Sequence, residues 1–370
     1  MSAAGTDGRL AVFTANVGGG GAERAMLKLA GGMAAHGYTV DLVLSRAEGE
    51  YLGEVPRAVR VVDLDARRVL ASLPRLVRYL RRERPSAMLT SLNYVNIVAL
   101  WARRVAGVPT RLVVNEQNTL SLEIPHSPRR RHRLLPGLIR RFYPWADGII
   151  AVSRGAADDL AKTTGLARER IQVVPNPIVT PELRAMAAAP IDHPWFAPGQ
   201  PPVLLGVGRL TPQKDFGTLI RAFARVRRPD GPRLMILGEG PERAALERLA
   251  TEAGLNGALA LPGRVSNPYP YMVRAGAFVL SSRWEGLPSV LIEALYCGIP
   301  VVATDCPSGP REILEGGRHG LLVPVGEVDA LADGIGAALA GEVPPPGEAS
   351  WRPYEQDEVV GRYLQVLGGV

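Results

Sequence analysis

The sequence is poor in the features that stabilise secreted proteins or anchor membrane proteins. It contains two cysteines, Cys297 and Cys306, in 370 residues. Two thiols cannot build a disulfide framework or a four-thiolate zinc site, and they fit a reducing compartment. No uninterrupted apolar run approaches the ~20 residues that a membrane-spanning helix needs. Residues 1–7 lack the basic and apolar segments of a signal peptide, so we expect a cytoplasmic protein.

Charge is plentiful, and it is distributed unevenly. Residues 1–180 contain 26 Lys and Arg against 15 Asp and Glu, whereas residues 181–370 contain 17 against 21. A basic half joined to a mildly acidic half indicates that the first half faces a polyanion, such as an anionic membrane surface or a nucleic acid. Aromatic residues make up only 6% of the chain, so stacking platforms for bases are scarce and we expect no nucleic-acid partner.

Short apolar runs alternate with amphipathic helical patterns along the chain. The strand candidates are residues 10–15, 39–44, 59–64, 87–90, 111–115, 148–152, 171–174, 203–207, 233–237, 259–261, 278–281 and 301–303. The helix candidates are residues 22–35, 69–83, 95–106, 153–163, 215–227, 241–253, 289–297, 328–340 and 354–367. This alternation predicts an α/β protein with βαβ units and mainly parallel sheets.

Eight prolines between Pro175 and Pro202 interrupt the alternation. Such a composition is typical of an interdomain connection. We therefore predict two doubly wound, Rossmann-like domains, residues 1–180 and 201–350, joined by a linker at 181–200. Ligands in such folds bind beyond the carboxyl ends of the strands, and we expect a cleft between the two domains.

A glycine-rich loop follows the first predicted strand. Gly18 and Gly19 let the backbone approach a ligand closely, and the N–H groups at the start of the next helix favour an anion. The dinucleotide fingerprint G-x-G-x-x-G would need a glycine where the chain has Glu23, so a nicotinamide cofactor is disfavoured. The alternative is a tight turn between strand and helix without a ligand.

A cationic loop follows the first predicted strand of the second half. It carries Arg209 and Lys214, and two cations five residues apart can both reach one diphosphate. The alternative is a pair of solvated surface cations.

An acidic loop, residues 284–294, carries the most specific pattern. Glu293 falls inside an apolar run, where a carboxylate needs a hydrogen-bond partner such as a ligand hydroxyl. Glu285 precedes residues 286–289, and the backbone N–H groups of this loop, at a helix start, could hold phosphate oxygens. The alternative is a helix-capping Glu followed by a core Glu paired to a neighbour.

Together these loops resemble the GT-B-fold retaining glycosyltransferases of family 4. Glu285 and Glu293 form the E-x7-E motif of that family. The supporting segments, in the right order along the chain, are the glycine loop 18–21, residues 174–176, Gly208 to Lys214, and residues 238–241. Residues 21–24 and 305–312 are most similar to members that build lipopolysaccharide, capsule or lipid-linked oligosaccharides.

The resemblance implies the activity. A hexose or N-acetylhexosamine would move from a nucleotide sugar, UDP-linked by default, to a lipid-linked or polysaccharide acceptor, with retention of anomeric configuration and without cofactor or essential metal. The first domain would bind the acceptor and the second the donor, and a C-terminal helix, residues 351–370, would cross back onto the first domain.

The resemblance also implies roles for individual residues. Arg209 and Lys214 would neutralise the donor diphosphate, Glu285 would bind sugar hydroxyls, and Glu293 would bind the ribose. The other donor-binding positions are Gly18, Gly19, Gly208, Arg264, Val265, Gly286, Leu287, Pro288 and Ser289. The chain departs from the family near Gln117, where many relatives have a histidine. Glutamine cannot relay a proton, so Glu116 and Gln117 are assigned to positioning the sugar or acceptor.

Two basic segments with interleaved apolar residues, 67–84 and 129–145, account for the charge of the first half. Such helices can lie in a membrane interface or pack an apolar face on the core with arginines in water. Both interpretations stay open for 67–84. In 129–145, arginines and aromatics flank an apolar centre, which favours contact with an anionic membrane surface and a peripheral location on the inner face of the cytoplasmic membrane.

Two other functions are compatible with parts of the sequence. A nucleotide-sugar epimerase shares the two-domain architecture, but it needs acid–base residues and the chain has five histidines. A non-catalytic protein that binds membrane or nucleic acid through its basic half would leave Glu285 and Glu293 without a role.

Overall fold

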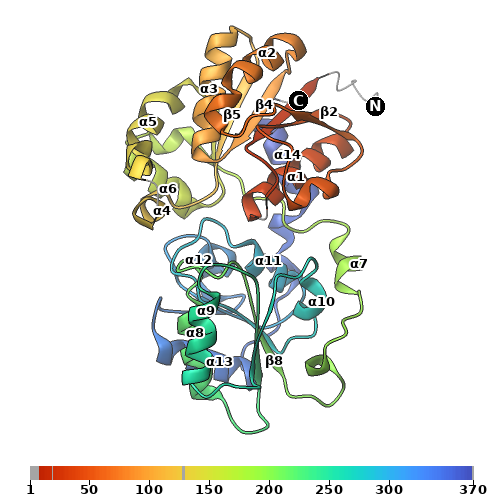
Figure 1. The fold of residues 1–370 in the computed structure, drawn as a ribbon, viewed down its shortest axis with the longest axis vertical. Coiled ribbons are helices and arrows are strands. Elements are labelled where there is room, and N and C mark those ends of the chain that lie inside the picture. The colour runs from red at the N-terminus through yellow and green to blue at the C-terminus, as the bar shows by residue number, and fades with distance from the viewer. Residues whose placement is uncertain (1–7, 19, 127–129, 369–370) are drawn as a thin grey trace. The chain divides into compact units, whose positions relative to one another are not determined.

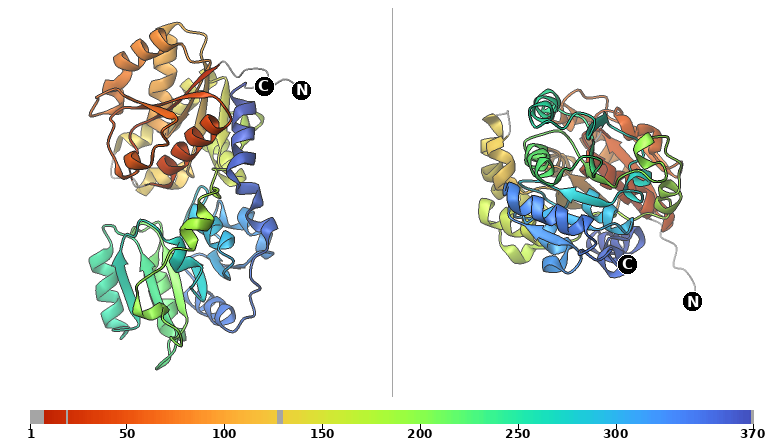
Figure 2. Two further views of the ribbon diagram at one scale, coloured as in Figure 1. Left: turned by 90° about the vertical axis from the view of Figure 1, so that its right-hand side faces the viewer. Right: turned by 90° about the horizontal axis from the view of Figure 1, so that it is seen from below.

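The protein folds into two compact units, shown by a computed structural model that describes residues 8–18, 20–126 and 130–368 (Figure 1). The first unit comprises residues 1–177 and 355–370, and the second comprises residues 178–354. Each unit is built on a parallel sheet with helices on both faces (Figure 2). The predicted α/β class with two Rossmann-like domains is confirmed.

The first unit contains a seven-stranded sheet in the order β3-β2-β1-β4-β5-β6-β7. Its strands are β1 Arg9–Thr14, β2 Thr39–Leu44, β3 Val59–Asp63, β4 Ala87–Ser91, β5 Arg111–Glu116, β6 Gly148–Ala151 and β7 Ile171–Val173. Its helices are α1 Gly21–Ala35, α2 Leu73–Glu83, α3 Asn93–Ala106, α4 Leu120–His126, α5 Leu135–Phe142, α6 Arg154–Thr164 and α14 Gln356–Val366. The order of the strands reverses between β1 and β4, which places the glycine loop after β1 at the topological switch point.

The second unit contains a six-stranded sheet in the order β10-β9-β8-β11-β12-β13. Its strands are β8 Val203–Val207, β9 Arg233–Leu237, β10 Leu259–Gly263, β11 Ala277–Leu280, β12 Val301–Thr304 and β13 Leu321–Val323. Its helices are α7 Leu183–Ala187, α8 Phe216–Val226, α9 Arg243–Glu252, α10 Tyr269–Met272, α11 Ser289–Tyr296, α12 Pro310–Ile313 and α13 Val328–Leu339. The switch point lies between β8 and β11, so the cationic loop after β8 and the acidic loop after β11 are neighbours.

The segment 181–200, which we expected to be a linker, is part of the second unit instead. Leu183 is buried, α7 packs against α10, and the Asn267 side chain donates to the Met186 carbonyl at 2.8 Å. Trp195 and Phe196 pack against the core of the same unit. The prolines of this segment therefore shape a cover on the second unit rather than a free connection.

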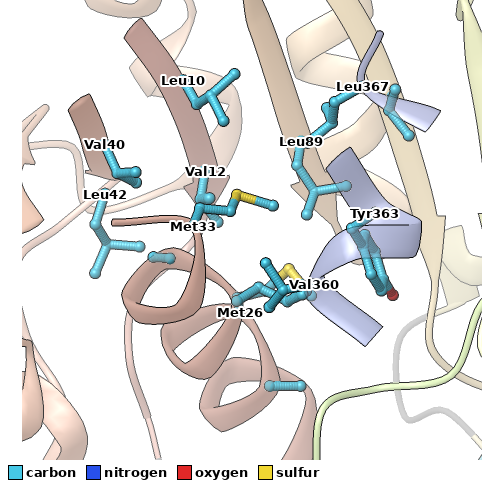
Figure 3. Packing of buried hydrophobic residues seen from close by; sticks show 14 of the residues in the cluster. Leu10, Val12, Met26, Met33, Val40, Leu42, Leu89, Val360, Tyr363 and Leu367 are labelled. Carbon is cyan, nitrogen blue, oxygen red and sulfur yellow. The ribbon is translucent and has the colours of Figure 1, made fainter. Parts of the chain in front are cut away.

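The C-terminal helix α14 packs into the core of the first unit, as expected. Val360 and Tyr363 are fully buried among side chains of α1 and the central strands, with Met26 and Leu89 close by (Figure 3). A Cβ on Gly32 of α1 would lie 2.5 Å from a Val360 methyl, so the glycine permits the two helices to approach closely. The terminal segment is thus a structural part of the first unit, although residues 178–354 separate it from the rest in the sequence.

In the part of the chain that the structure describes, no helix has the length and apolarity needed to cross a membrane.

Candidate functional site

The cationic and acidic loops of the second unit are joined by backbone and side-chain hydrogen bonds. Arg283 N donates to Gln213 O at 2.8 Å, and the Gln213 side chain donates to Trp284 O at 2.9 Å. Ser281 Oγ donates to Lys214 O at 2.7 Å. Residues distant in sequence are therefore held in one rigid constellation at the carboxyl ends of β8 and β11.

This arrangement brings Lys214 and Glu285 into direct contact. The Lys214 Nζ lies 2.5 Å from Glu285 Oε1, and the two side chains are only 17% and 7% exposed. Ser282 Oγ donates to the same carboxylate oxygen at 2.6 Å, and Thr304 Oγ1 donates to Ser282 O at 2.6 Å. A partly desolvated ion pair needs such additional hydrogen bonds, because burial of charge is costly without them. The sequence did not identify Ser282, since a serine before an acidic loop carries no specific signal.

Asp215 fixes the end of the cationic loop. It adopts a left-handed conformation with φ +46°, caps α8 by accepting from Thr218 N at 3.4 Å and from Thr218 Oγ1 at 2.9 Å, and pairs with Arg283 Nε at 2.9 Å. Because Lys214 immediately precedes this cap, its backbone is fixed relative to α8. An Asp directly before an amphipathic helical pattern is a helix-start signal that could have identified the cap.

Glycines allow the loops after β8 and β9 to pack backbone against backbone. Gly208 N donates to Leu237 O at 3.0 Å, and a Cβ on Gly238 would lie 1.9 Å from Gly208 O. Gly240 is equally constrained, because its Cβ would lie 2.3 Å from Leu210 O. The residues 238–241 that supported the family resemblance therefore shape the loop of Gly208 and Lys214.

Glu293 is buried in α11 with 5% of its surface exposed. Tyr269 is the first residue of α10, and its hydroxyl group donates a hydrogen bond to Glu293 Oε1 at 3.0 Å. A carboxylate that is buried in an apolar run needs such a hydrogen-bond donor, and the bond fixes the orientation of the Glu293 carboxylate. Tyr269 was not identified from the sequence, because a single tyrosine in a proline-rich turn has many possible roles.

The turn that starts α11 is supported by the segment after β12. Ser308 Oγ donates to Gly286 O at 3.0 Å, and Gly309, with φ +92°, lies so near that its Cβ would meet Pro288 Cδ at 2.4 Å. Gly286 and Pro288 are buried, whereas Leu287 and Ser289 are half-buried. The conformation of these four residues is thus set by close packing against residues 305–310.

The remaining donor-site candidates are more open. Arg209 is exposed on the loop of Lys214. Arg264 is exposed directly after β10, two strands from β8, and Val265 is half-buried against the core of the second unit. An open pocket of about 620 Å³, lined by Arg283 and the Asp305–Arg311 ion pair, lies beside the acidic loop.

In the first unit, the loop after β2 supports the glycine loop after β1. Val17 N donates to Glu48 O at 3.1 Å, Tyr51 N donates to Val17 O at 3.1 Å, and Gly18 N donates to Asn16 Oδ1 at 3.1 Å. Gly18 is therefore held in a defined turn. Gly19 lies outside the described residues.

Glu116 and Gln117 end β5 in different environments. Glu116 is 3% exposed and accepts hydrogen bonds from Tyr143 OH and, at 3.1 Å, from Asn96 Nδ2. Burial, with the charge of Glu123 adding to it, raises the pKa of Glu116 to about 8. Gln117 is half-buried and exchanges two amide hydrogen bonds, at 3.2 and 2.7 Å, with Asn176. Glu116 is thus engaged inside the unit, and Gln117 is the more accessible of the two.

Metal-binding side chains do not gather in the described ranges: no group of three or more His, Cys, Asp and Glu there could hold an ion. Both cysteines are free thiols, and burial raises the pKa of each to about 12. The polar groups that the loops of the candidate site bring together are carboxylates, cations and backbone N–H groups.

Comparison with known proteins agrees with this arrangement. Residues 19–181 match the family described as Glycosyltransferase Family 4, and residues 190–356 match Glycosyl transferases group 1. The N-acetylgalactosamine-N,N'-diacetylbacillosaminyl-diphospho-undecaprenol 4-alpha-N-acetylgalactosaminyltransferase of Campylobacter jejuni is 34% identical over 67% of this chain and 65% of its own length. The lipopolysaccharide core biosynthesis glycosyltransferase LpsE of Rhizobium meliloti is 28% identical over 87% of this chain and 86% of its own.

Solved structures show the same fold. The lipopolysaccharide outer core galactosyltransferase WaaB, in its apo form, superposes with a TM-score of 0.72 at 19% identity, over 97% of this chain and 99% of that one. Anabaena Alr3699/HepE in complex with UDP-glucose superposes with a TM-score of 0.76 at 19% identity, over 98% of this chain and 100% of that one. With glycosyltransferase families matching both units and E-x7-E at the second switch point, the chain belongs to the family 4 glycosyltransferases of the GT-B fold.

Proposed function

We propose that this protein is a retaining glycosyltransferase that transfers a hexosyl or N-acetylhexosaminyl group from a UDP-linked donor to a lipid-linked or polysaccharide acceptor. The observation that carries the proposal is the contact between Lys214 and Glu285. It places a cation suited to a diphosphate next to a carboxylate suited to sugar hydroxyls, at the switch point where a doubly wound sheet binds its ligand.

Each part of the donor has a candidate partner in the second unit. Lys214 and the exposed Arg209 would neutralise the diphosphate and the charge that develops on it as the sugar leaves. Glu285 would accept hydrogen bonds from sugar hydroxyls, and Glu293 from the ribose. The N–H groups of Gly286, Leu287 and Ser289, at the start of α11, would hold phosphate oxygens, while Pro288 has no N–H and shapes the turn. Because two cations serve the diphosphate, we propose a reaction that needs no metal ion and no cofactor.

The reaction breaks the bond between the anomeric carbon and the donor phosphate oxygen. The acceptor hydroxyl attacks the anomeric carbon from the face that the diphosphate leaves, and its proton passes to a phosphate oxygen of the departing UDP. The new glycosidic bond then has the configuration of the old one. Protein groups stabilise the leaving diphosphate and orient the sugar, which is electrostatic and positional catalysis.

The relatives support the choice of donor and acceptor. The name of the Campylobacter enzyme specifies a diphospho-undecaprenol acceptor and an alpha-N-acetylgalactosaminyl group. HepE has been solved with UDP and with UDP-glucose. LpsE is named for lipopolysaccharide core biosynthesis, and the glycosyltransferase AmsD of Erwinia amylovora is named for amylovoran biosynthesis. We therefore propose an envelope glycan as the product.

The test is nucleotide release from a panel of UDP-, GDP-, ADP- and dTDP-sugars, with chelator present, with and without a bacterial lipid-linked acceptor extract. We expect release from one UDP-sugar, stimulated by the extract and unaffected by chelator, and an alpha-linked product from an alpha-linked donor by NMR. A Glu285→Gln variant should remove the stimulated release. Conversion of the donor to its epimer without an acceptor would instead identify an epimerase, and a folded protein that releases no nucleotide would refute the proposal.

A further inference from the structure

An aromatic and cationic surface covers the C-terminal ends of α3 and α5, two helices that lie side by side in the first unit (Figure 1). Trp101 on α3 meets Phe142 at the end of α5 edge to face, with 5.2 Å between ring centroids. Phe142 meets Trp145 in the same way at 5.0 Å, and Trp145 belongs to the short 3-10 helix η4, Tyr143–Trp145. All three rings are half-buried, so each has one part in the unit and one part at its surface.

Two exposed arginines lie over these rings. The Arg104 guanidinium is 5.6 Å from the centre of the Trp145 ring, and the Arg141 guanidinium is 5.6 Å from Trp145 and 5.7 Å from Phe142. Cation–π contact holds the guanidinium groups against the aromatic cluster, and both arginines are exposed. The surface therefore presents positive charge beside apolar rings.

An exposed apolar side chain lies next to this cluster. Val105, adjacent to Arg104, is 58% exposed. Leu134 is 66% exposed, but it lies just before α5, about two helical turns from Phe142, so it extends the apolar surface along that helix without joining the cluster. Exposed Val105 beside half-buried tryptophans forms an apolar patch of the kind that marks an interaction surface.

Charge near the patch is predominantly positive. Arg81 of α2 donates to Val105 O at 2.9 Å, which adds a third cation to the edge of the patch. The nearest carboxylate along the chain from Trp145 is Asp147, and it already forms an ion pair with Arg103. The surface is thus complementary to an anionic partner that also has an apolar layer.

We propose that the surface formed by Trp101, Arg104, Val105, Arg141, Phe142 and Trp145, the α3–α5 surface, docks the first unit onto an anionic lipid bilayer. Tryptophan is suited to the boundary between headgroups and acyl chains, arginine to anionic headgroups, and exposed aliphatic side chains to the acyl region. Nucleic acid is a poorer match, because the ring edges and guanidinium groups of the cluster are already stacked on one another rather than open to bases. The inference rests on the proposed function only in that a lipid-linked acceptor gives membrane contact its purpose.

Of the two basic segments that the sequence offered for membrane contact, we place the proposed contact in 129–145 only. In the 67–84 segment, Leu76, Val77 and Leu80 are buried, so the apolar face of α2 packs on the core of the first unit, whereas Leu70, before that helix, is 59% exposed. In α5, Leu135 and Ile139 are buried, but Leu138 and Phe142 stay partly exposed. Arg129 lies outside the described residues, and the α3 contribution of Trp101 and Arg104 was not predicted.

The test is co-flotation of the full chain with vesicles of phosphatidylcholine alone or mixed with phosphatidylglycerol, at several salt concentrations. We expect binding to the anionic vesicles only, weakening as salt rises. A cation near anionic lipid contributes about a factor of five to affinity, so Arg104→Gln/Arg141→Gln should bind about 30-fold more weakly. Trp145→Phe should reduce fluorescence quenching by brominated lipids while retaining a ring in the cluster.

Two matched controls remove the same charge elsewhere. Arg78→Gln/Arg82→Gln lies on the exposed face of α2, and Arg227→Gln/Arg228→Gln lies on the second unit. Both controls should bind anionic vesicles as the unaltered chain does, and thermal melting measures whether the first unit is intact in every variant.

Several outcomes would overturn the proposal. The first two are equal binding to neutral and anionic vesicles, and no binding to either kind of vesicle. The third is a loss of binding in the α2 control that matches the loss in Arg104→Gln/Arg141→Gln. The fourth is tighter binding to an RNA competitor than to anionic vesicles at the same salt concentration. None of these outcomes depends on nucleotide release, so failure of membrane docking and failure of the proposed transferase activity are distinguishable.

Discussion

The ion pair between Lys214 and Glu285 gives each residue two roles, one in the fold and one with the donor. Replacing Lys214 by Met leaves a largely buried carboxylate without its cation, so it should both lower stability and weaken UDP binding. A hydrogen bond to a charged group contributes roughly 1.5–3 kcal/mol, which corresponds to about 10- to 100-fold in UDP affinity. Calorimetric titration with UDP and thermal melting measure the two effects separately.

The double variant Lys214→Met/Glu285→Gln separates the two roles. It removes both charges, so melting should recover toward the unaltered protein while UDP affinity stays low. Arg209→Ala is the matched control for the diphosphate, because Arg209 is exposed and its loss should weaken UDP binding without lowering the melting temperature. Recovery of UDP binding in the double variant would show that Lys214 serves only the fold.

Glu293 allows a test of the ribose assignment that does not depend on activity. If the carboxylate accepts from ribose hydroxyls, the protein should prefer UDP over its 2′-deoxy or 3′-deoxy analogue, and Glu293→Gln should remove most of that preference. Tyr269→Phe removes the hydroxyl that orients the carboxylate, and it should reduce the same preference at a cost of ~1 kcal/mol in stability. An unchanged preference in Glu293→Gln would mean that the glutamate is only a core residue.

The raised pKa of Glu116 predicts that the stability of the first unit depends on pH. Its pKa is 4.5 in an exposed setting and about 8 in the folded chain, chiefly because of burial. Between these values the unfolded chain has lost the proton that the folded chain keeps, so the free energy of unfolding falls as pH rises, at up to ~1.4 kcal/mol per pH unit. Below pH 4.5 and above pH 8 the contribution is constant.

Glu116→Gln measures this contribution, because glutamine is neutral at every pH and keeps an oxygen that can accept from Tyr143. The difference in unfolding free energy between the unaltered chain and this variant should therefore fall from pH 5 to pH 8, as followed by denaturant titration. A flat difference across this pH range would refute a buried carboxyl that keeps its proton.

The sequence identified candidate residues for the site, but it did not identify the side chains that hold them in place. Lys214, Glu285 and Glu293 were identified because charges in a loop after a strand, or inside an apolar run, are unusual. Their supports, such as Ser282 and Tyr269, are ordinary residue types whose role exists only after folding brings them to a carboxylate. Such contacts join positions that neither periodicity nor motif spacing relates.

At the scale of elements, the loops of the site are stabilised mainly by close packing between turns. Gly309→Ala should disturb this packing, because the new methyl would lie 2.4 Å from Pro288 and the residue has φ +92°. A positive φ alone costs roughly 1–3 kcal/mol for a residue with a side chain, and the clash adds displacement of residues 286–289. We expect lower stability and at least tenfold weaker donor binding.

Gly317→Ala is the matched control for this substitution. Gly317 also has a positive φ, +110°, but a Cβ there would meet nothing within 4 Å. It should lower the melting temperature through backbone strain and leave UDP affinity unchanged. Equal loss of UDP binding in both variants would mean that general destabilisation, rather than the position of the α11 turn, controls the donor site.

Sequence periodicity predicted the buried elements and overlooked the shallow ones. Every strand with a fully buried run was expected within one or two residues of its bounds. The edge strand β13 was missed, because its three residues are half-exposed at one end and carry too short a pattern. The proline-rich segment 181–200 was assigned to a linker, since proline spacing does not reveal that Leu183 and Trp195 pack onto a core.

At the scale of the whole molecule, each unit has its own hydrophobic core. The core of the first unit includes α14, so its stability depends on residues that 178–354 separate from the rest of the unit in the sequence. The core of the second unit lies within the continuous segment 178–354, which also carries Arg209, Lys214, Glu285 and Glu293, the charged residues that we assign to the donor. Changes in one core should therefore act on one unit alone.

Calorimetric melting with and without UDP tests this independence. Val360→Ala removes two buried methyl groups from the core of the first unit, and it should lower the free energy of unfolding of that unit by roughly 1–2.5 kcal/mol. UDP at 100 times its Kd should raise the free energy of unfolding of the second unit by ~2.7 kcal/mol, and the melting transition of the first unit should not change. Val302→Ala, at a fully buried position of the second core, should give the opposite pattern. A shift confined to one unit requires that the core of this unit can melt while the other unit stays folded. A single transition that both substitutions and UDP shift would therefore show that the two units unfold together as one cooperative body.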